Sequence, residues 1–193
     1  ETVIAEIQPT LPAGQIIVTI APGKTLAWLG ERLGDVKSVR TMPNTPALLG
    51  EGMTGMAYEE SNYSEEEKAV LRGIFEACGR LEVVDERMMD AVGCVSGCSP
   101  AYVYMFIEAM ADAAVADGMP RAQAYKFAAQ SVYGSAEVVL EKGKHTGELK
   151  DAVCSPAGTT IEAVAALEAG GFRSTVISAQ RACSQKSRDM SSK

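Results

Sequence analysis

The sequence predicts an α/β fold in its first half, a parallel sheet with crossover helices, followed by an all-α helical bundle. Two observations lead to this fold class. Up to about residue 85, short β-branched or apolar runs alternate with segments of helical periodicity, as in parallel sheets with crossover helices. From about residue 86 onward the periodicity is helical throughout. We therefore expect two rigidly joined domains, over residues 1–90 and 91–193.

Four strands are predicted in the first half, each a short apolar or β-branched run. The first lies between Gly14 and Pro22, as expected of a buried parallel strand bounded by turn residues. The strands are expected at residues 16–20, 38–42, 53–58 and 81–84.

Two helices are predicted between these strands. One is expected over residues 24–33 and ends at Gly34, a residue common after helix C-termini. The other is expected over residues 64–78. It opens with a capping-box pattern, in which Ser64 is followed three positions later by Glu67.

The second half reads as a series of helices. Ser99 and Pro100 begin a long helix that ends at Gly118, and Pro120 opens a second helix that runs to about Glu141. Small residues cover much of the second helix, which suits close packing in a bundle. Further helices are expected at residues 147–153, 159–169 and 172–190.

The composition argues against several classes of function. With 47% hydrophobic and 22% charged residues, the chain is typical of globular proteins. A net charge of −7 provides no basic stripe for a nucleic acid. No apolar run reaches membrane-spanning length and no secretory leader is seen, so we expect a cytoplasmic protein without a membrane partner.

The cysteines and the histidine do not indicate a metal site. The five cysteines are odd in number and lack paired spacing, and the chain has one histidine. We expect reduced, partly buried thiols and no metal. His145 lies between two predicted helices and is expected to be structural.

The hexapeptide SPAGTT at residues 155–160 directly precedes an apolar helical run. Pro156 suits the first turn of a helix, and Ser155 is the expected N-cap. Gly158 lets the backbone approach a ligand, and free N–H groups at a helix start suit a small anion such as a carboxylate. A capped helix without a ligand explains the same spacing.

Three segments together resemble pyrroline-5-carboxylate reductases. They are RTMPNTPALLGEGMTGMA (residues 40–57), SGCSPAYVYMFIEAMADAAVADGMPR (residues 96–121) and HTGELKDAVCSPAGTTI (residues 145–161). The resemblance runs from about Ile16 to the C-terminus. Members of this family carry out the last step of proline biosynthesis, in which NADPH or NADH reduces a cyclic imine.

The resemblance implies an architecture and an assembly. The first domain is expected to be the remainder of a Rossmann-like parallel sheet, and the helical domain to serve dimerisation and substrate binding. Two chains are expected to form a homodimer with shared active sites, and larger rings of dimers occur in the family. Two positions depart from the usual pattern: Ala157 replaces the first glycine of Ser-Pro-Gly-Gly, and Thr146 replaces the proline after the histidine. Neither change removes a side chain that the chemistry needs.

The resemblance also implies the substrate site. Thr160 is expected to be catalytic, because the family's second threonine of this turn donates a hydrogen bond that orients the imine and relays a proton to its nitrogen. The backbone amides of Thr159 and Thr160, with Ser155 and Gly158 beside them, are expected to hold the substrate carboxylate. Glu86 falls where the family has a glutamate near the substrate, although its position alone also fits a helix-start charge.

Cofactor contacts are expected at two strand ends. Ile20, Ala21 and Pro22 match a cofactor-lining turn of the family. Since Pro22 lacks an N–H, any contact there would be through a carbonyl or by packing. Asn44 and Thr45 follow the second strand, where open α/β sheets bind ligands, and the resemblance puts them near the nicotinamide. Composition alone predicts only a Pro-Asn turn.

The sequence contains no Gly-x-Gly-x-x-Gly after a strand, and the family carries that unit upstream of the region matched here. We therefore expect a chain without the first part of the dinucleotide-binding domain, inactive by itself. Two alternatives are a non-catalytic dimerisation fragment and a related reductase of another cyclic imine. Hydroxy-acid enzymes of this architecture use a lysine on the first long helix, and none lies between Ser99 and Asp117.

Overall fold

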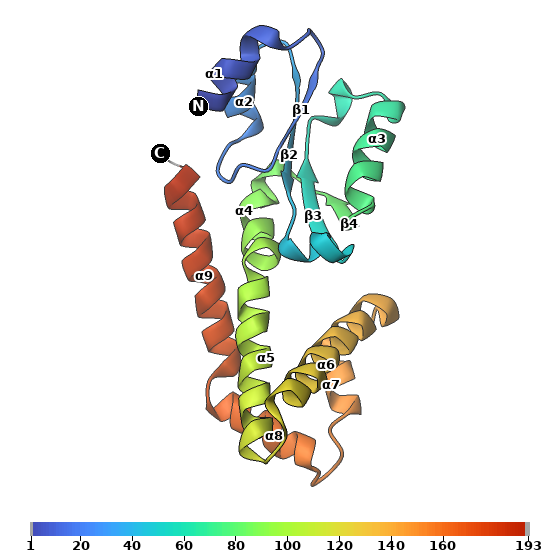
Figure 1. Cartoon of the computed structure of the whole chain (residues 1–193), viewed down its shortest axis with the longest axis vertical. Helices are drawn as coiled ribbons and strands as arrows, with labels where there is room; N and C mark the ends of the chain where they lie inside the picture. Colours follow the sequence, from blue (N-terminus) through green and yellow to red (C-terminus); the bar gives the residue numbers. More distant parts are fainter. Residues whose placement is uncertain (1, 192–193) are drawn as a thin grey trace. The chain divides into compact units, whose positions relative to one another are not determined.

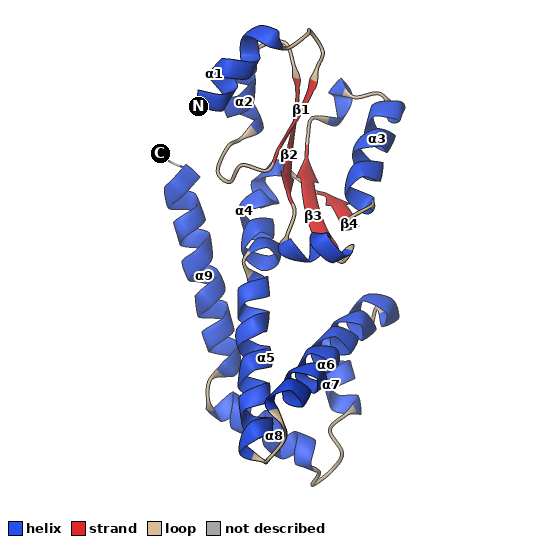
Figure 2. Ribbon diagram, viewed as in Figure 1, coloured by secondary structure: helices blue, strands red, loops and turns tan. Residues whose placement is uncertain are grey.

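A sheet-containing unit and a helical unit make up the chain (Figures 1 and 2). The first unit comprises residues 1–100 and 180–193, and the second comprises residues 101–179. The computed structural model describes residues 2–191. The first unit thus includes the end of the last helix, whereas the sequence predicts domains that meet at residue 90.

One four-stranded sheet forms the centre of the first unit, and the sequence predicts all four of its strands. In the order in which they pair, the strands are β1 (Ile16–Thr19), β2 (Lys37–Met42), β3 (Gly52–Ala57) and β4 (Gly79–Val83). The pair β1–β2 is parallel, β2–β3 is antiparallel and β3–β4 is parallel. The sheet is therefore mixed.

The prediction of an entirely parallel sheet is wrong for β2 and β3. A parallel connection needs a crossover of about a dozen residues or more. Only residues 43–51 join these strands, and they contain the short 3₁₀ helix η2 (Thr45–Leu49). The chain therefore turns back at the same edge of the sheet, and β3 pairs antiparallel to β2.

Helix α3 (Glu65–Glu76) covers one face of the sheet. Its Leu71 packs with Val39 of β2 and Met56 of β3 in the buried core, together with Tyr63 from the preceding loop. The Tyr63 hydroxyl donates to the Ser38 carbonyl at 2.9 Å, and burial is the main cause that raises its pKa to about 12. The Tyr63 hydroxyl thus forms a hydrogen bond within the core of the first unit.

The other face is covered by α2 (Leu26–Leu33) and α4 (Met89–Val92), on the side of the sheet opposite α3 in Figure 1. A β-carbon at Gly55 of β3 would lie 2.6 Å from Val92 Cγ1 of α4. Only glycine at this position lets the helix pack so closely on the sheet.

Local signals in the sequence define two helix starts. The predicted capping box is present: Glu67 N–H donates to Ser64 Oγ at 3.2 Å, and Ser64 N–H donates to Glu67 Oε2 at 2.8 Å. His145 caps α7 (Thr146–Ala152), because its Nδ1 accepts from Gly147 N–H at 3.1 Å. His145 therefore has the structural role predicted for it.

From residue 86 onward the described chain is helical, as the sequence predicts. In order, the remaining elements are η4 (Glu86–Met88), the π-helical turn η5 (Gly93–Gly97), α5 (Ser99–Ala116), α6 (Arg121–Lys142), α8 (Thr159–Ala169) and α9 (Phe172–Ser191). At the other end, α1 (Thr2–Ile7) and η1 (Gln8–Thr10) precede the sheet and were not predicted. Within residues 2–191, no helix combines the length and the apolar character that crossing a membrane requires.

Candidate functional site

The predicted site residues lie in both units. The first unit contains Ile20, Ala21, Pro22, Asn44, Thr45 and Glu86, and the second contains Ser155, Gly158, Thr159 and Thr160. Each set has its own local geometry. In the part of the chain that the structure describes, no group of three His, Cys, Asp or Glu side chains is placed to hold a metal ion.

The two predicted cofactor segments lie at the same edge of the sheet. Because β1 and β2 are parallel neighbours, their carboxyl ends lie side by side, and the loops that start with Ile20 and Pro43 both leave from there. The Thr41 hydroxyl donates to the Thr19 carbonyl at 3.1 Å and links the two strand ends. The structure therefore brings these segments together, as the sequence predicts.

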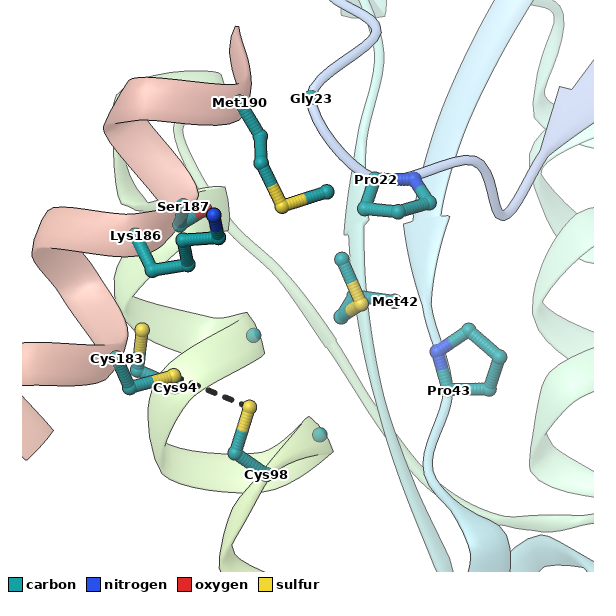
Figure 3. Close-up of a pocket in the computed structure, with 12 residues that line it drawn as sticks. Pro22, Gly23, Met42, Pro43, Cys94, Cys98, Cys183, Lys186, Ser187 and Met190 are labelled. Carbon is teal, nitrogen blue, oxygen red and sulfur yellow. Dashed lines mark hydrogen bonds between the residues drawn. The ribbon is translucent and has the colours of Figure 1, made fainter. Parts of the chain in front are cut away.

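A pocket of about 410 Å³ opens at this edge of the sheet (Figure 3). Pro22 and Gly23 line it from the loop after β1, and Met42 and Pro43 line it from the end of β2. The rest of the wall comes from η5, from Cys98 between η5 and α5, and from the last turns of α9, where Lys186 contributes an ammonium group. The lining is mainly apolar, which suits a flat ring with few polar contacts.

Two glycines of η5 keep one wall of the pocket open. A β-carbon at Gly93 would lie 3.5 Å from Met42 Cε, and one at Gly97 would lie 3.8 Å from Met42 Sδ. Longer side chains at these positions would extend into the space beside Met42. Single π-helical turns are frequent at functional sites. No role was predicted for η5 or α9 from the sequence, although the Gly-x-x-x-Gly spacing of η5 is visible there.

The side chain of Asn44 is bound by the protein itself. Its Oδ1 accepts from Met53 N–H at 2.9 Å, and its Nδ2 donates to the Ser96 carbonyl at 3.3 Å. Ser96 Oγ in turn donates to the Met53 carbonyl at 3.3 Å. Asn44 thus holds the loop after β2, including Thr45, between β3 and η5.

Glu86 lies in a network around a buried arginine. Glu86 Oε1 accepts from Leu26 N–H at 2.7 Å and is 3.4 Å from Arg40 Nη1. The Arg40 side chain is only 5% exposed, and its Nη2 lies 3.6 Å from Asp90 Oδ1, which also accepts from Ser187 Oγ at 3.1 Å. The network joins β2 to the start of α2, to α4 and to α9. The structure thus gives Glu86 a positioning role in the first unit.

In the second unit, the predicted N-cap at Ser155 is wrong, because α8 begins four residues later with Gly158 as its N-cap residue. Gly158 N–H donates to the Ser155 carbonyl at 3.0 Å and closes a β-turn. Proline at the second position of this turn and a positive φ at the third, Ala157, are the features of a type II turn. The fixed φ of Pro156 suits this turn as well as a helix start.

Ala157 adopts an unusual backbone conformation. With φ of 56°, it is the one non-glycine residue with positive φ among residues 2–191. This conformation costs an L-residue about 1–2 kcal/mol. The resemblance expects glycine at position 157. Because alanine stands there, the turn forms with backbone strain that glycine would avoid.

The turn places an open helix start beside two threonines. Gly158 has no side chain to cap α8, and a β-carbon there would lie 2.3 Å from Ser155 Oγ. The first N–H groups of a helix have no intrahelical partner, and they attract anions. Thr160 is half-buried and Thr159 is exposed. The segment thus combines backbone donors with hydroxyl groups on one short stretch of chain.

Comparison with known proteins shows which family this chain belongs to. The family model described as Pyrroline-5-carboxylate reductase dimerisation matches residues 86–190. The pyrroline-5-carboxylate reductase of Escherichia coli K12 is 55% identical over 190 residues, which cover 98% of this chain and 70% of that protein. The chain belongs to the pyrroline-5-carboxylate reductase family. The relative from Arabidopsis thaliana is 43% identical over 188 residues, covering 97% of this chain and 68% of that protein.

Solved structures agree with the pyrroline-5-carboxylate reductase assignment. The pyrroline carboxylate reductase of Plasmodium falciparum, determined with NADP bound, superposes with a TM-score of 0.90 at 34% identity. The match covers 98% of this chain and 76% of that one. The enzyme from Coxiella burnetii gives a TM-score of 0.88 at 30% identity, covering 97% of this chain and 70% of that one. The predicted family and fold class are therefore confirmed, and the family activity is NAD(P)H-dependent reduction.

We predict that Arg40→Met lowers the free energy of unfolding by about 3 kcal/mol, because it leaves two partly buried carboxylates without their cation. The midpoint of urea denaturation measures this loss. Arg87→Met is the matched control: Arg87 is 84% exposed beside Asp85, so this change should leave the midpoint unchanged. Equal shifts in the two variants would contradict the network.

We predict that Ala157→Gly raises the free energy of unfolding by about 0.5–1 kcal/mol, since it relieves the positive φ at a smaller cost in chain entropy. Ala157→Val should lower it, because β-branched residues tolerate positive φ poorly. Ala165→Gly, in the exposed interior of α8, should lower it by about 1 kcal/mol. Thermal melting separates the variants, and a lower midpoint for Ala157→Gly would refute the strained turn.

Proposed function

We propose that this protein reduces 1-pyrroline-5-carboxylate to L-proline with NADPH or NADH. The observation that carries the proposal is the open start of α8 at Thr159 and Thr160, preceded by the Ser155–Gly158 turn, in a chain of this family. A small substrate with one carboxylate and one ring nitrogen matches the backbone donors and the hydroxyl group of this segment.

The pocket of the first unit fits the nicotinamide end of the cofactor. It lies at the carboxyl ends of β1 and β2, where open α/β sheets bind nucleotides. Its apolar walls at Pro22 and Met42 and its glycine-lined side at η5 suit a flat aromatic ring. When bound there, the reduced nicotinamide supplies the hydride. Ile20, Ala21, Asn44 and Thr45 shape the loops around this pocket.

The segment at the start of α8 orients the substrate. The backbone N–H groups of Thr159 and Thr160 hold the carboxylate at the positive end of the helix, next to Ser155 and Gly158. The Thr160 hydroxyl donates to the ring nitrogen and provides a route for its proton. Hydride addition to an imine needs little further acid–base help, so the protein contributes mainly by orienting the reactants.

We propose a homodimer in which each active site takes residues from both copies. Within residues 101–179, only the alanines Ala111, Ala124 and Ala128 are buried. Large apolar side chains of the same unit are exposed, among them Met105 at 68% and Phe127 at 62%. A helical unit with so little core of its own is stabilised when a second copy covers these faces.

The division of the candidate residues between the units supports a shared site. The cofactor pocket belongs to the first unit and the substrate turn to the second. In a dimer built through the helical unit, the turn of one copy completes the pocket of its partner. Assembly into larger rings and a cytoplasmic location stay predictions.

We predict that Thr160→Ala, made in a protein that also carries the upstream Gly-x-Gly-x-x-Gly unit, lowers kcat for reduction of 1-pyrroline-5-carboxylate roughly 100-fold, because a preorganised donor is lost. Thr160→Ser keeps the hydroxyl and should retain most of the activity. NADPH oxidation followed by absorbance measures turnover, and the Kd for NADPH should be equal in both variants. Unchanged turnover in Thr160→Ala of the protein with the upstream unit would favour the alternative in which this segment serves dimerisation without taking part in catalysis. Turnover only with a different cyclic imine would favour the related reductase.

We predict that Phe127→Asp dissociates the dimer. Burying an unpaired carboxylate in an apolar interface has a large desolvation cost, so the interface should no longer form. Light scattering after size-exclusion chromatography should show a mass near the 20.4 kDa of one chain for this variant and twice that for the unchanged chain. Val70→Asp, at a position of α3 that is 63% exposed, is the matched control and should remain dimeric. A dimeric Phe127→Asp would contradict this interface.

A further inference from the structure

Three of the five cysteines gather beside the pocket of the first unit (Figure 3). Cys183 of α9 lies with its Sγ 3.1 Å from the Sγ of Cys98, which directly precedes α5. Cys94 of η5 accepts a hydrogen bond from Ser184 Oγ at 3.4 Å. A disulfide joins its sulfur atoms at about 2.05 Å, so Cys98 and Cys183 need to approach by only about 1 Å.

We propose that Cys98 and Cys183 form a reversible disulfide when a hydroperoxide oxidises the protein. One thiolate attacks a peroxide oxygen, the O–O bond breaks, and a sulfenic acid forms with release of water or an alcohol. The second thiolate attacks the sulfenic sulfur, the S–S bond forms, and the released hydroxide takes a proton to become water. The two thiols lose two electrons, and the peroxide gains them.

The surroundings of the sulfur atoms favour this pair over Cys94. Cys94 is 2% exposed, and burial is the main cause that raises the pKa of its thiol. Since the thiolate is the reactive form, Cys94 stays a thiol. Cys98 and Cys183 are half-buried and line the pocket, so a small peroxide reaches both through the pocket opening.

The disulfide would fix the last turns of α9 to the segment between η5 and α5. Both segments form walls of the pocket that also contains Met42 and Pro43. This consequence rests on the proposed function, in which the pocket receives the nicotinamide. Oxidation should therefore lower reductase activity several-fold, and dithiothreitol should restore it.

Peptide mapping of the purified protein tests the disulfide directly. The reduced protein is treated with hydrogen peroxide, its remaining thiols are blocked with N-ethylmaleimide, and it is digested with trypsin. The expected product is a cross-link between the peptides of residues 88–121 and 182–186, with a mass about 2 Da below the sum of the two peptides once the N-ethylmaleimide on Cys94 is included. It should disappear on reduction.

Four variants assign the bond. Cys98→Ser and Cys183→Ser should abolish the cross-link, and they should also remove the difference in activity between oxidised and reduced protein. Cys94→Ala should keep the cross-link, which matters because residues 88–121 contain Cys94 as well as Cys98. Cys78→Ser removes an exposed cysteine and should behave as the unchanged protein.

The outcomes separate this proposal from the proposed function. No cross-link after peroxide treatment, or a cross-link that persists in Cys98→Ser, would overturn the disulfide. A cross-link with unaltered activity would overturn its effect on the pocket. The activity of the reduced protein tests the proposed function independently. A cross-linked protein that shows no reductase activity before oxidation, even with the upstream dinucleotide-binding unit present, would refute that function and leave the disulfide supported.

Discussion

The buried guanidinium of Arg40 holds together elements around the pocket of the first unit. A charge with so little contact to water is stable only when carboxylates face it, and Glu86 and Asp90 do so from η4 and α4. Through Leu26 N–H and Ser187 Oγ the same carboxylates fix the start of α2 and the last turns of α9. One buried charge thus links β2 to the start of α2, to α4 and to the end of α9, and the end of α9 forms part of the pocket wall.

The Ser155–Gly158 turn, for which we propose substrate binding, depends on a different constraint, a strained backbone. The positive φ of Ala157 directs the chain so that Gly158 begins α8 without a side-chain cap, and the first helical amides stay available to a ligand. The two proposed sites are thus built separately, one at a sheet edge and one at a helix start. The helical unit, with alanines as its buried residues, joins the two sites in our account only when a second copy is present.

Local signals made much of the fold predictable from the sequence. Periodicity identified all four strands, and the Ser64–Glu67 pattern fixed a helix start. The antiparallel pairing of β3 was missed, although the short connection after β2 makes a crossover impossible. The N-cap at Ser155 was misplaced because proline suits turns and helix starts equally. Contacts between distant segments carry no local signal, so neither the partners of Arg40 nor the pocket wall from α9 was foreseen.

In the dimer that we propose, the pocket of one copy and the Ser155–Gly158 turn of the other make one active site. Mixed dimers of two variants test whether the copies share their sites. Thr160→Ala damages the turn, and Gly97→Leu fills the glycine side of the pocket beside Met42. Each variant alone should be nearly inactive. If sites are shared, a mixed dimer contains one intact site, so random exchange of subunits should restore about a quarter of the unchanged activity. If the mixture stays as inactive as its components, both sites belong to single chains and the account is wrong.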